Sequence, residues 1–317
     1  MTQAWVFDEF GGPEVLRLAE HETPASLQGN ELRIRMHASA LNPIDAKIRN
    51  GTSWVAQKRR ADRIPFPWGI GFDMSGEVLE AGPETSFSPG DLVFGPAGYV
   101  YAPCACAREV VCEDTYMAAA AGCDLTQAAA LPIAGVTALD MLPAIESHGG
   151  REILLTGASG GVGHILVSLL RLRGYQVTAL VSRGNFELAE RQGAAECLDY
   201  ARDQSAHHGR YAVVIDMLGG ELGKSFCRFL RSGGLFITVP TYSRDELIAH
   251  ARDTVTDVTA TGTLAQITRS KLEYLRDLVT SGQLQVHVSH AYEFGELTEA
   301  HRQIESTHTP GKIVLMG

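Results

Sequence analysis

The sequence predicts an α/β protein that combines a β-rich domain with a doubly wound parallel sheet. Two patterns indicate this fold: short alternating or apolar stretches fill the chain before Asp124, and strands alternating with long helices follow it. The length of 317 residues, 45% of them hydrophobic, is the third indication, since domains usually hold about 100–200 residues. Two domains are therefore expected.

The β-rich part comes first. Strands are expected from Glu31 to Ala38 and from Gly76 to Ala81. Clusters rich in Gly, Pro and Asp, such as Phe10 to Glu14 and Ser88 to Asp91, supply the turns between such stretches. This pattern is typical of a small barrel or sandwich.

The middle of the chain alternates between strands and helices. Short apolar strands joined by helices of this length indicate βαβ units, so a parallel sheet covered on both faces is expected. The expected elements are, in order, Glu152 to Thr156, Gly161 to Arg173, Gln176 to Val181, Phe186 to Gln192, Glu196 to Leu198, Ala212 to Asp216, Gly220 to Leu230 and Leu235 to Val239.

After Asp257 the alternation loosens. Helices are expected from Ile267 to Ser281 and from Leu297 to Glu305, with a further strand from Lys312 to Leu315. Because these elements are too few to form a core of their own, we expect them to return to the β-rich domain. The predicted domains are 1–123 with 263–317, and 124–262.

Charge, hydropathy and cysteine spacing exclude several classes of function. The 37 acidic residues outnumber the 27 basic ones, which disfavours nucleic acid as a partner because phosphate binding needs an excess of Lys and Arg. No apolar run approaches the roughly 20 residues of a membrane span, and Met1 to Trp5 lacks the features of a secretory signal, so a cytoplasmic protein is expected. The six cysteines contain no C-x-x-C pair, so reduced thiols are expected.

The strongest local signal is the glycine-rich segment Gly157-Ala158-Ser159-Gly160-Gly161-Val162-Gly163, which connects an apolar strand to an apolar helix. Glycines allow the backbone to turn sharply and approach a pyrophosphate, whose charge the helix N-terminus stabilises. The spacing G-x-x-G-x-x-G differs from the common G-x-G-x-x-G. Its position inside a βαβ unit predicts a dinucleotide cofactor bound at Ser159, Gly160, Gly161 and Val162.

The end of the next strand bears on which nicotinamide cofactor is used. NAD sites usually present an acidic residue there, whereas this chain has Ser182 and Arg183. A hydroxyl and a guanidinium suit a 2′-phosphate, which a carboxylate would repel, so NADPH is favoured. The alternative for Arg183 is a solvated loop residue. Tyr200, after the third strand, is expected to bring its hydroxyl to the same phosphate.

Six segments occur in a characteristic order: Ala40 to Gly51, Gly71 to Val78, Gly90 to Gly95, Ala130 to Ala138, Gly157 to Gly163, and Gly311 to Leu315. Together they resemble the medium-chain dehydrogenase/reductase superfamily, and within it the zinc-independent quinone oxidoreductase (ζ-crystallin-like) and enone reductase branch. The resemblance implies a GroES-like catalytic domain (1–123 and 263–317), a Rossmann NADP-binding domain (124–262) and a homodimer.

The zinc-dependent alcohol dehydrogenases of this superfamily carry metal ligands that this chain lacks. Where they have a ligand cysteine and then a His-Glu pair, this chain reads Asn42-Pro43-Ile44-Asp45 and Gly71-Phe72-Asp73. The four closely spaced cysteines of their structural zinc site are also missing, because Cys104, Cys106 and Cys112 have another spacing. No metal is therefore expected.

The resemblance indicates two candidate catalytic residues beside the expected interdomain cleft. Lys47 is expected to donate a hydrogen bond to a substrate carbonyl and stabilise an enolate; a solvated or phosphate-binding lysine is the alternative. Asn42 is expected to line the cleft through its amide or by shaping the loop before Pro43; a turn residue is the alternative. Asp45 is expected to orient Arg49, four residues further along a helix.

The remaining cofactor residues follow from the resemblance alone. Thr137 is expected near the nicotinamide ribose or, alternatively, in a role at a helix N-terminus. The others are expected to line the adenine and nicotinamide sides mostly through backbone groups. These others are Leu218, Val239, Pro240, Thr241 and Leu264.

Residues and resemblance together predict an NADPH-dependent, zinc-free oxidoreductase that acts on a small molecule. Without a metal, a conjugated acceptor is the easier substrate because the charge that develops on its oxygen is delocalised. Hydride transfer to a quinone or to the C=C bond of an α,β-unsaturated carbonyl is therefore expected. The alternatives are an enoyl-thioester reductase on the same fold and a non-catalytic NADPH-binding redox sensor.

Overall fold

The chain forms two compact units. The computed structural model describes residues 1–98, 104–306 and 309–317. Unit 1 consists of Met1–Ala134, Ile267–Gly282 and Val286–Gly317, and unit 2 consists of Gly135–Gln266 and Gln283–Gln285. Unit 2 is therefore inserted into the chain of unit 1.

Helix α4 (Pro132–His148) belongs to both units, since the boundary between them falls after Ala134. The sequence places this boundary at Asp124, where the residue pattern changes. By contrast, the residues of the chain begin to contact unit 2 instead of unit 1 only inside this helix. The helix continues through Pro143, although proline has no backbone N–H. The residue pattern and the contacts in the structure therefore place the domain boundary at different positions.

Unit 1 is rich in β-structure. Its strands are β1 (Thr2–Phe7), β2 (Arg17–His21), β3 (Glu31–Leu41), β4 (Trp68–Gly69), β5 (Asp73–Ala81), β6 (Leu92–Pro96), β7 (Glu109–Glu113), β8 (Ala118–Ala119), β15 (Val288–Tyr292) and β16 (Lys312–Met316). Its helices are α1 (Pro43–Arg49), α2 (Trp54–Ala61), α3 (Leu125–Ala129), α9 (Arg269–Thr280) and α10 (Leu297–Glu305). One sheet has the order β15-β16-β3-β5-β6-β8, with β7 also paired to β3, and another has the order β2-β1-β4.

Strand β3 connects early and late parts of the chain. It pairs antiparallel with β5, where Ala40 lies opposite Asp73, and with β16, where Leu41 lies opposite Ile313. The end of β3 therefore lies beside the beginnings of β5 and β16. Side chains from these three places meet, although they are far apart in sequence.

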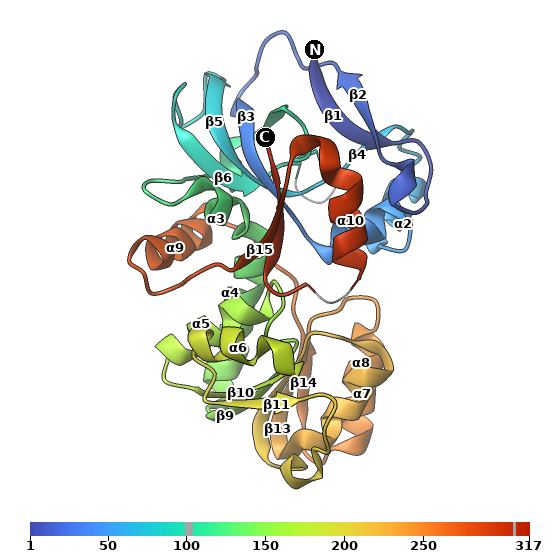
Figure 1. Ribbon diagram of the computed structural model, residues 1–317, viewed down its shortest axis with the longest axis vertical. Helices are drawn as coiled ribbons and strands as arrows, with labels where there is room; N and C mark the ends of the chain where they lie inside the picture. Colours follow the sequence, from blue (N-terminus) through green and yellow to red (C-terminus); the bar gives the residue numbers. More distant parts are fainter. Residues whose placement is uncertain (99–103, 307–308) are drawn as a thin grey trace. The chain divides into compact units, whose positions relative to one another are not determined.

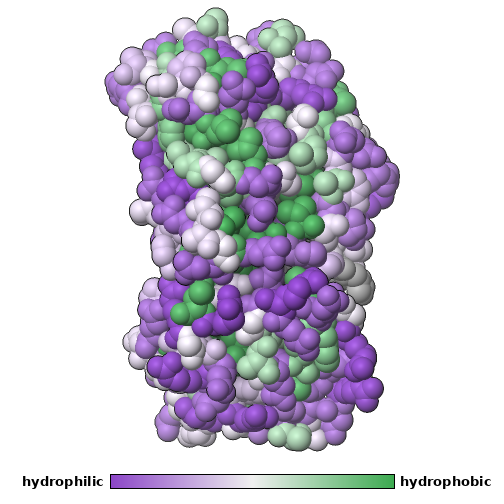
Figure 2. Space-filling model, turned by 60° about the vertical axis from the view of Figure 1, so that its left-hand side comes forward, coloured by the Kyte–Doolittle hydropathy of each residue, from purple (hydrophilic) through white to green (hydrophobic). Residues whose placement is uncertain are grey.

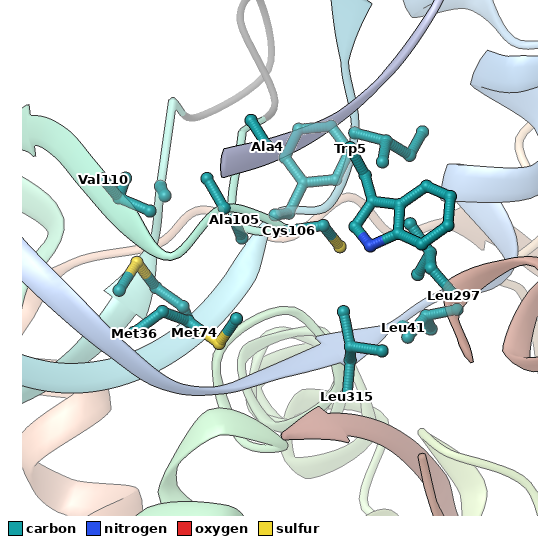
Figure 3. Close-up of a cluster of buried hydrophobic side chains, with 14 of the residues drawn as sticks. Ala4, Trp5, Met36, Leu41, Met74, Ala105, Cys106, Val110, Leu297 and Leu315 are labelled. Carbon is teal, nitrogen blue, oxygen red and sulfur yellow. The ribbon is translucent and has the colours of Figure 1, made fainter. Parts of the chain in front are cut away.

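The core of unit 1 holds these strands in place. Trp5 on β1 is 6% exposed, and its indole N–H donates to the carbonyl oxygen of Phe294 at 2.8 Å. Burying a large apolar side chain is worth about 1.5–3 kcal/mol. Figure 3 shows Trp5 with the other labelled members of this cluster, which are Ala4, Met36, Leu41, Met74, Ala105, Cys106, Val110, Leu297 and Leu315.

Unit 2 is a parallel sheet accompanied by helices. Its strands are β9 (Glu152–Thr156), β10 (Gln176–Val181), β11 (Glu196–Asp199), β12 (Tyr211–Asp216), β13 (Leu230–Thr238) and β14 (Thr259–Gly262). Its helices are α5 (Gly163–Leu172), α6 (Phe186–Gln192), α7 (Gly220–Phe226) and α8 (Arg244–Thr254), together with the short 3-10 helix η3 (Arg183–Asn185). The strand order is β11-β10-β9-β12-β13-β14, and the pairings are parallel.

The strand order reverses between β9 and β12. Because β9-to-β10 and β12-to-β13 progress in opposite directions across the sheet, right-handed crossovers place their helices on opposite faces. Accordingly, α5 contacts α6, and α7 contacts α8 (Figure 1). In such sheets ligands bind outside the carboxyl ends of the strands at the reversal.

The surface combines hydrophilic regions with apolar patches. Figure 2 shows a face on which hydrophilic residues predominate and hydrophobic residues gather in separate patches. In unit 2, Leu218, Leu222, Tyr242 and Leu264 are large apolar or aromatic residues with exposed side chains. Within the part of the chain that the structure describes, no helix combines the length and hydropathy needed to cross a bilayer.

Candidate functional site

The candidate cofactor residues of unit 2 lie at one edge of its sheet. Gly157 directly follows β9, Ser182 follows β10, Tyr200 follows β11 and Val239 follows β13, while Leu218 lies shortly after β12. The carboxyl ends of parallel strands share an edge, so the fold brings these residues together.

The glycine turn has a backbone that only glycine accommodates well. Gly157 has a φ of +60°, and its carbonyl oxygen accepts a hydrogen bond from the Gly160 N–H at 2.9 Å. A Cβ atom on Gly163 would collide with the carbonyl oxygen of Gly157, so glycine lets α5 begin close to the turn. The first N–H groups of a helix have no partner within it, and the turn therefore fits the phosphates of a dinucleotide.

Tyr200 supports this turn from the neighbouring strand end. Its hydroxyl oxygen accepts a hydrogen bond from the backbone N–H of Gly157 at 2.7 Å. Burial raises the pKa of the Tyr200 phenol to about 12, so it stays protonated at neutral pH. The sequence predicts a contact between this hydroxyl and the 2′-phosphate. The structure shows this hydroxyl bonded to the glycine turn, and its contact with the 2′-phosphate stays a prediction.

Ser182 and Arg183 are exposed directly after β10. The guanidinium carbon of Arg183 lies 5.9 Å from the ring centre of Phe186. Asn185, which the sequence analysis missed, donates from its amide nitrogen to Ser182 Oγ at 3.0 Å and to Ser159 Oγ at 3.1 Å. This amide connects the end of β10 to the glycine turn, and a single asparagine after a strand gives no signal of such a connection.

The backbone of Leu218 is already hydrogen-bonded within the protein. Its N–H donates to Asp216 Oδ1 at 3.0 Å, and its carbonyl oxygen accepts from the Tyr242 hydroxyl at 2.9 Å. The residue is 37% exposed, and its place along the cofactor stays a prediction. Asp216, also missed, is fully buried and further accepts from the Gly219 N–H and the Thr238 hydroxyl, so it fixes this loop.

The other predicted cofactor residues fall into two groups. Val239, Pro240 and Thr241 follow β13, and Leu264 follows β14 with 48% of its surface exposed, so these lie at the same edge of the sheet. Thr137 is 7% exposed within α4, well after the first turn of that helix. The alternative of a role at the helix N-terminus is therefore wrong.

In unit 1, Asn42 belongs to a buried polar triad with Asp73 and Lys312. Its amide nitrogen donates to Asp73 Oδ2 at 2.9 Å, and its amide oxygen accepts from the Lys312 ammonium at 2.6 Å. Lys312 Nζ lies 3.7 Å from Asp73 Oδ2, and Asp73 Oδ1 also accepts from the Ile133 N–H at 3.1 Å. The pairing of β3 with β5 and β16 creates this triad.

Burial changes the ionisation of the polar triad. Asp73 is fully buried and Lys312 is 3% exposed. Burial raises the pKa of Asp73 to about 6, against the opposing effect of Lys312, and it lowers the pKa of Lys312. Both ends of the Asn42 amide are bonded inside the protein, and Asn42 is the N-cap of α1, so it fixes the loop before Pro43. Its place beside a substrate stays a prediction.

Asp45 caps helix α1. Its Oδ2 accepts a hydrogen bond from the Asn42 backbone N–H at 2.7 Å, while its Oδ1 is buried without a partner among the described residues. Burial raises the pKa of Asp45 to about 7. The expectation that Asp45 orients Arg49 is wrong, because the Arg49 guanidinium is bonded to Glu305 and His301 on α10.

Lys47 lies on α1, two residues after Asp45, and is half-buried. Burial lowers the pKa of its ammonium group. A cation whose charged form is destabilised by burial is a stronger hydrogen-bond donor towards negative charge. The carbonyl oxygen of Lys47 accepts the Ser53 N–H at 3.0 Å, so α1 is tied to the beginning of α2.

The polar triad does not suit a zinc ion. Lys312 places a cation against the amide oxygen of Asn42 and near the Asp73 carboxylate, so the two oxygens already have a positive partner. Within residues 1–98, 104–306 and 309–317, no group of three or more His, Cys, Asp or Glu side chains is arranged to hold a metal. The six cysteines form no disulfide.

Comparison with known proteins establishes the family. A model described as the alcohol dehydrogenase GroES-like domain matches residues 28–140, and one described as zinc-binding dehydrogenase matches residues 192–315. The solved structure of the quinone oxidoreductase from Coxiella burnetii is 34% identical, covers 100% of this chain and 99% of that chain, and aligns with a TM-score of 0.93. The chain belongs to the quinone oxidoreductase branch of the medium-chain dehydrogenase/reductase superfamily.

Two further relatives fit this assignment. Mitochondrial NAD(P)H oxidoreductase RTN4IP1 of Mus musculus is 28% identical over 350 residues, covering 98% of this chain and 88% of the relative. Chloroplastic NADPH-dependent alkenal/one oxidoreductase of Arabidopsis thaliana is 26% identical over 331 residues, covering 99% of this chain and 79% of the relative. Membership of the quinone oxidoreductase branch confirms the predicted fold class, a GroES-like domain with a Rossmann domain, and makes the protein an oxidoreductase.

Proposed function

We propose that this protein is an NADPH-dependent, zinc-free reductase of quinones or of the C=C bond of α,β-unsaturated carbonyl compounds. The observation that carries the proposal is the edge of the unit 2 sheet, where the glycine turn is bonded through Asn185 to Ser182, next to an exposed Arg183. The quinone and alkenal/one oxidoreductases among the relatives support the two substrate classes.

The residues of this edge suit NADPH better than NADH. The glycine turn and the first N–H groups of α5 would hold the pyrophosphate. Ser182 and Arg183 would hold the 2′-phosphate, because a guanidinium offers a fixed positive charge and a fork of donors. When bound, NADPH supplies a hydride. NADH lacks the 2′-phosphate and would gain nothing from Arg183.

Lys47 is the residue of unit 1 that we assign to the substrate. During reduction of an enone, negative charge collects on the carbonyl oxygen, and a hydrogen bond from the Lys47 ammonium would stabilise it. The burial that lowers the pKa of Lys47 strengthens this donor. Asn42 and Asp45 contribute by fixing the N-terminus of α1, and water supplies the proton that completes the reduction.

The zinc-free part of the proposal rests on the polar triad. The Lys312 ammonium contacts Asn42 at 2.6 Å and lies 3.7 Å from Asp73, so it occupies the place beside these oxygens that a metal cation would need. Hydrogen bonds alone must then stabilise the developing charge, and conjugated acceptors require least stabilisation.

A substrate screen tests the proposal. Oxidation of NADPH would be followed spectrophotometrically with quinones, enals, enones, enoyl-thioesters and saturated ketones, before and after dialysis against a chelator. We expect turnover of quinones or enones, a preference for NADPH, and unchanged rates after dialysis. Activity restored only by zinc, or turnover confined to saturated ketones, would contradict the proposal. Turnover of enoyl-thioesters alone, or cofactor binding without turnover, would favour the two alternative functions.

A further inference from the structure

Asn185 joins two serine hydroxyls that come from different strand ends. Ser159 lies in the glycine turn after β9, and Ser182 directly follows β10. The Asn185 amide nitrogen is 3.1 Å from Ser159 Oγ and 3.0 Å from Ser182 Oγ. The Asn185 backbone N–H also donates to the Ser182 carbonyl oxygen at 2.9 Å, which fixes the short helix η3 that carries this side chain. Asn185 is thus held at the junction of the two segments.

The amide group of Asn185 determines which groups at this junction donate hydrogen bonds and which accept them. The amide nitrogen carries two hydrogens, and the two contacts use one for each hydroxyl. Each hydroxyl oxygen therefore acts as an acceptor towards Asn185. A hydroxyl that accepts one hydrogen bond still has its own hydrogen to donate. Ser159 and Ser182 are thereby left as two donors, directed away from Asn185.

Two hydroxyl donors beside an arginine form a set that matches a phosphate, whose oxygens only accept when it is fully ionised. Ser182 and Arg183 are exposed and Ser159 is buried, so this set is open to solvent on the side of Ser182 and Arg183. The acidic residue that follows on α6, Glu187, has its carboxylate 2.8 Å from Arg191 and is therefore partly neutralised. Asp199 on β11 lies opposite Val181 and accepts the Ala201 N–H at 3.0 Å, so Arg183 is the cation that would attract an anion at this strand end.

We propose that Asn185 is a positioning residue for the 2′-phosphate of NADPH, which it selects by orienting the hydroxyls of Ser159 and Ser182 as donors. The inference rests on the proposed function, because it concerns the same cofactor. It assigns part of the selectivity to a side chain that need not touch the cofactor itself.

At position 185, asparagine should favour binding of the 2′-phosphate, whereas aspartate should oppose it. An aspartate has nearly the same shape, but its carboxylate oxygens only accept. Both serine hydroxyls would then donate to the carboxylate and be lost as donors to the phosphate. The carboxylate would also repel the phosphate. Asn185→Asp should therefore reduce selectivity more than Asn185→Ala, although it removes fewer atoms.

Calorimetric titration with two fragments tests this without any turnover. The probes are adenosine 2′,5′-bisphosphate and adenosine 5′-monophosphate, which differ only in the 2′-phosphate. Wild-type protein is compared with Asn185→Ala, Asn185→Asp and, as a matched control in unit 1, Asn50→Ala. The measured quantity is the ratio of the two dissociation constants, because general loosening of the sheet edge affects both probes alike.

We expect the wild type and Asn50→Ala to bind the bisphosphate more tightly than the monophosphate. Asn185→Ala should lower this preference by about 10-fold, the effect of weakening one or two hydrogen bonds to a charged group, and Asn185→Asp should abolish it. If the wild type prefers the bisphosphate and both Asn185 variants keep the same ratio, the role of Asn185 is refuted while the NADPH assignment stands. If the wild type shows no preference, both are refuted.

Discussion

Replacing Lys312 by methionine removes the one cation of the polar triad and keeps most of the side-chain volume. Lys312 is 3% exposed, its ammonium contacts Asn42 at 2.6 Å, and it lies 3.7 Å from Asp73, which is fully buried. The substitution leaves the Asp73 carboxylate without its counter-charge and the Asn42 amide oxygen without its donor. Both groups are too deeply buried for water to replace the lost partner.

Removing one partner of a buried ion pair costs about 3–5 kcal/mol. Asp73 keeps the hydrogen bonds from Asn42 and from the Ile133 N–H, so we expect a loss near the lower end, about 3 kcal/mol. For a unit of this size each kcal/mol lowers the midpoint of thermal unfolding by about 2–4 °C, which predicts a fall of roughly 10 °C. Circular dichroism during heating and denaturant titration measure both quantities.

Two comparisons make this prediction refutable. Lys58→Met removes a surface pair in which Lys58 and Asp62 are 2.8 Å apart with side chains 46% and 44% exposed, and it should cost at most about 1 kcal/mol. Adding Asp73→Asn to Lys312→Met should recover part of the loss, because no unpaired charge remains. The reasoning fails if Lys312→Met costs no more than Lys58→Met, or if the losses of the two triad substitutions simply add.

Three further outcomes are expected. Burial raises the pKa of Asp45 from 3.8 to about 7, so the folded protein binds a proton at Asp45 more tightly than the unfolded chain does. The free energy of unfolding should therefore fall as pH rises from about 4 to about 7, by at most about 1.4 kcal/mol per pH unit. Asp45→Asn should remove this part of the dependence, and denaturant titrations at several pH values that show identical slopes for both proteins would contradict it. Lys47→Ala should lower kcat for a small enone by about 100-fold, with partial retention in Lys47→Arg; steady-state rates equal to wild type would exclude the assigned donor. Arg183→Glu should weaken NADPH by at least about 10-fold while NADH changes little, as measured by fluorescence titration, and an equal loss for both cofactors would remove our account of cofactor choice.

Elements with strong local signals could be predicted from the sequence. The strands β9 and β10 and the helices α6 and α10 have the predicted bounds, because glycine turns and apolar periodicity mark their ends. Helix α8 and strand β14 were not predicted. The apolar face of α8 consists of little more than Leu247 and Ala251, and β14 is four residues of Thr, Ala and Gly, so neither has a clear period.

In the candidate site, too, features formed by neighbouring residues could be predicted, whereas contacts between distant residues could not. The glycine turn and the pair Ser182–Arg183 are contiguous in sequence and could be identified from their chemistry. The contact between Asn42 and Lys312 could not be predicted, because Lys312 lies 270 positions away and approaches Asn42 only through the pairing of β16 with β3. Asn185 was missed for a related reason, since its two contacts depend on β9 and β10 being neighbours in space.

The late position of β16 has a consequence for biosynthesis. Unit 2 consists of residues 135–266 and 283–285, so ribosomes have translated all of it before they reach Lys312. The sheet of unit 1, by contrast, needs β16, a strand that is translated after all of unit 2. A nonsense mutation just upstream of that codon would yield a polypeptide whose nucleotide-type domain can form but whose Asn42 loop has no ammonium to hold it, a ready substrate for proteolytic quality control.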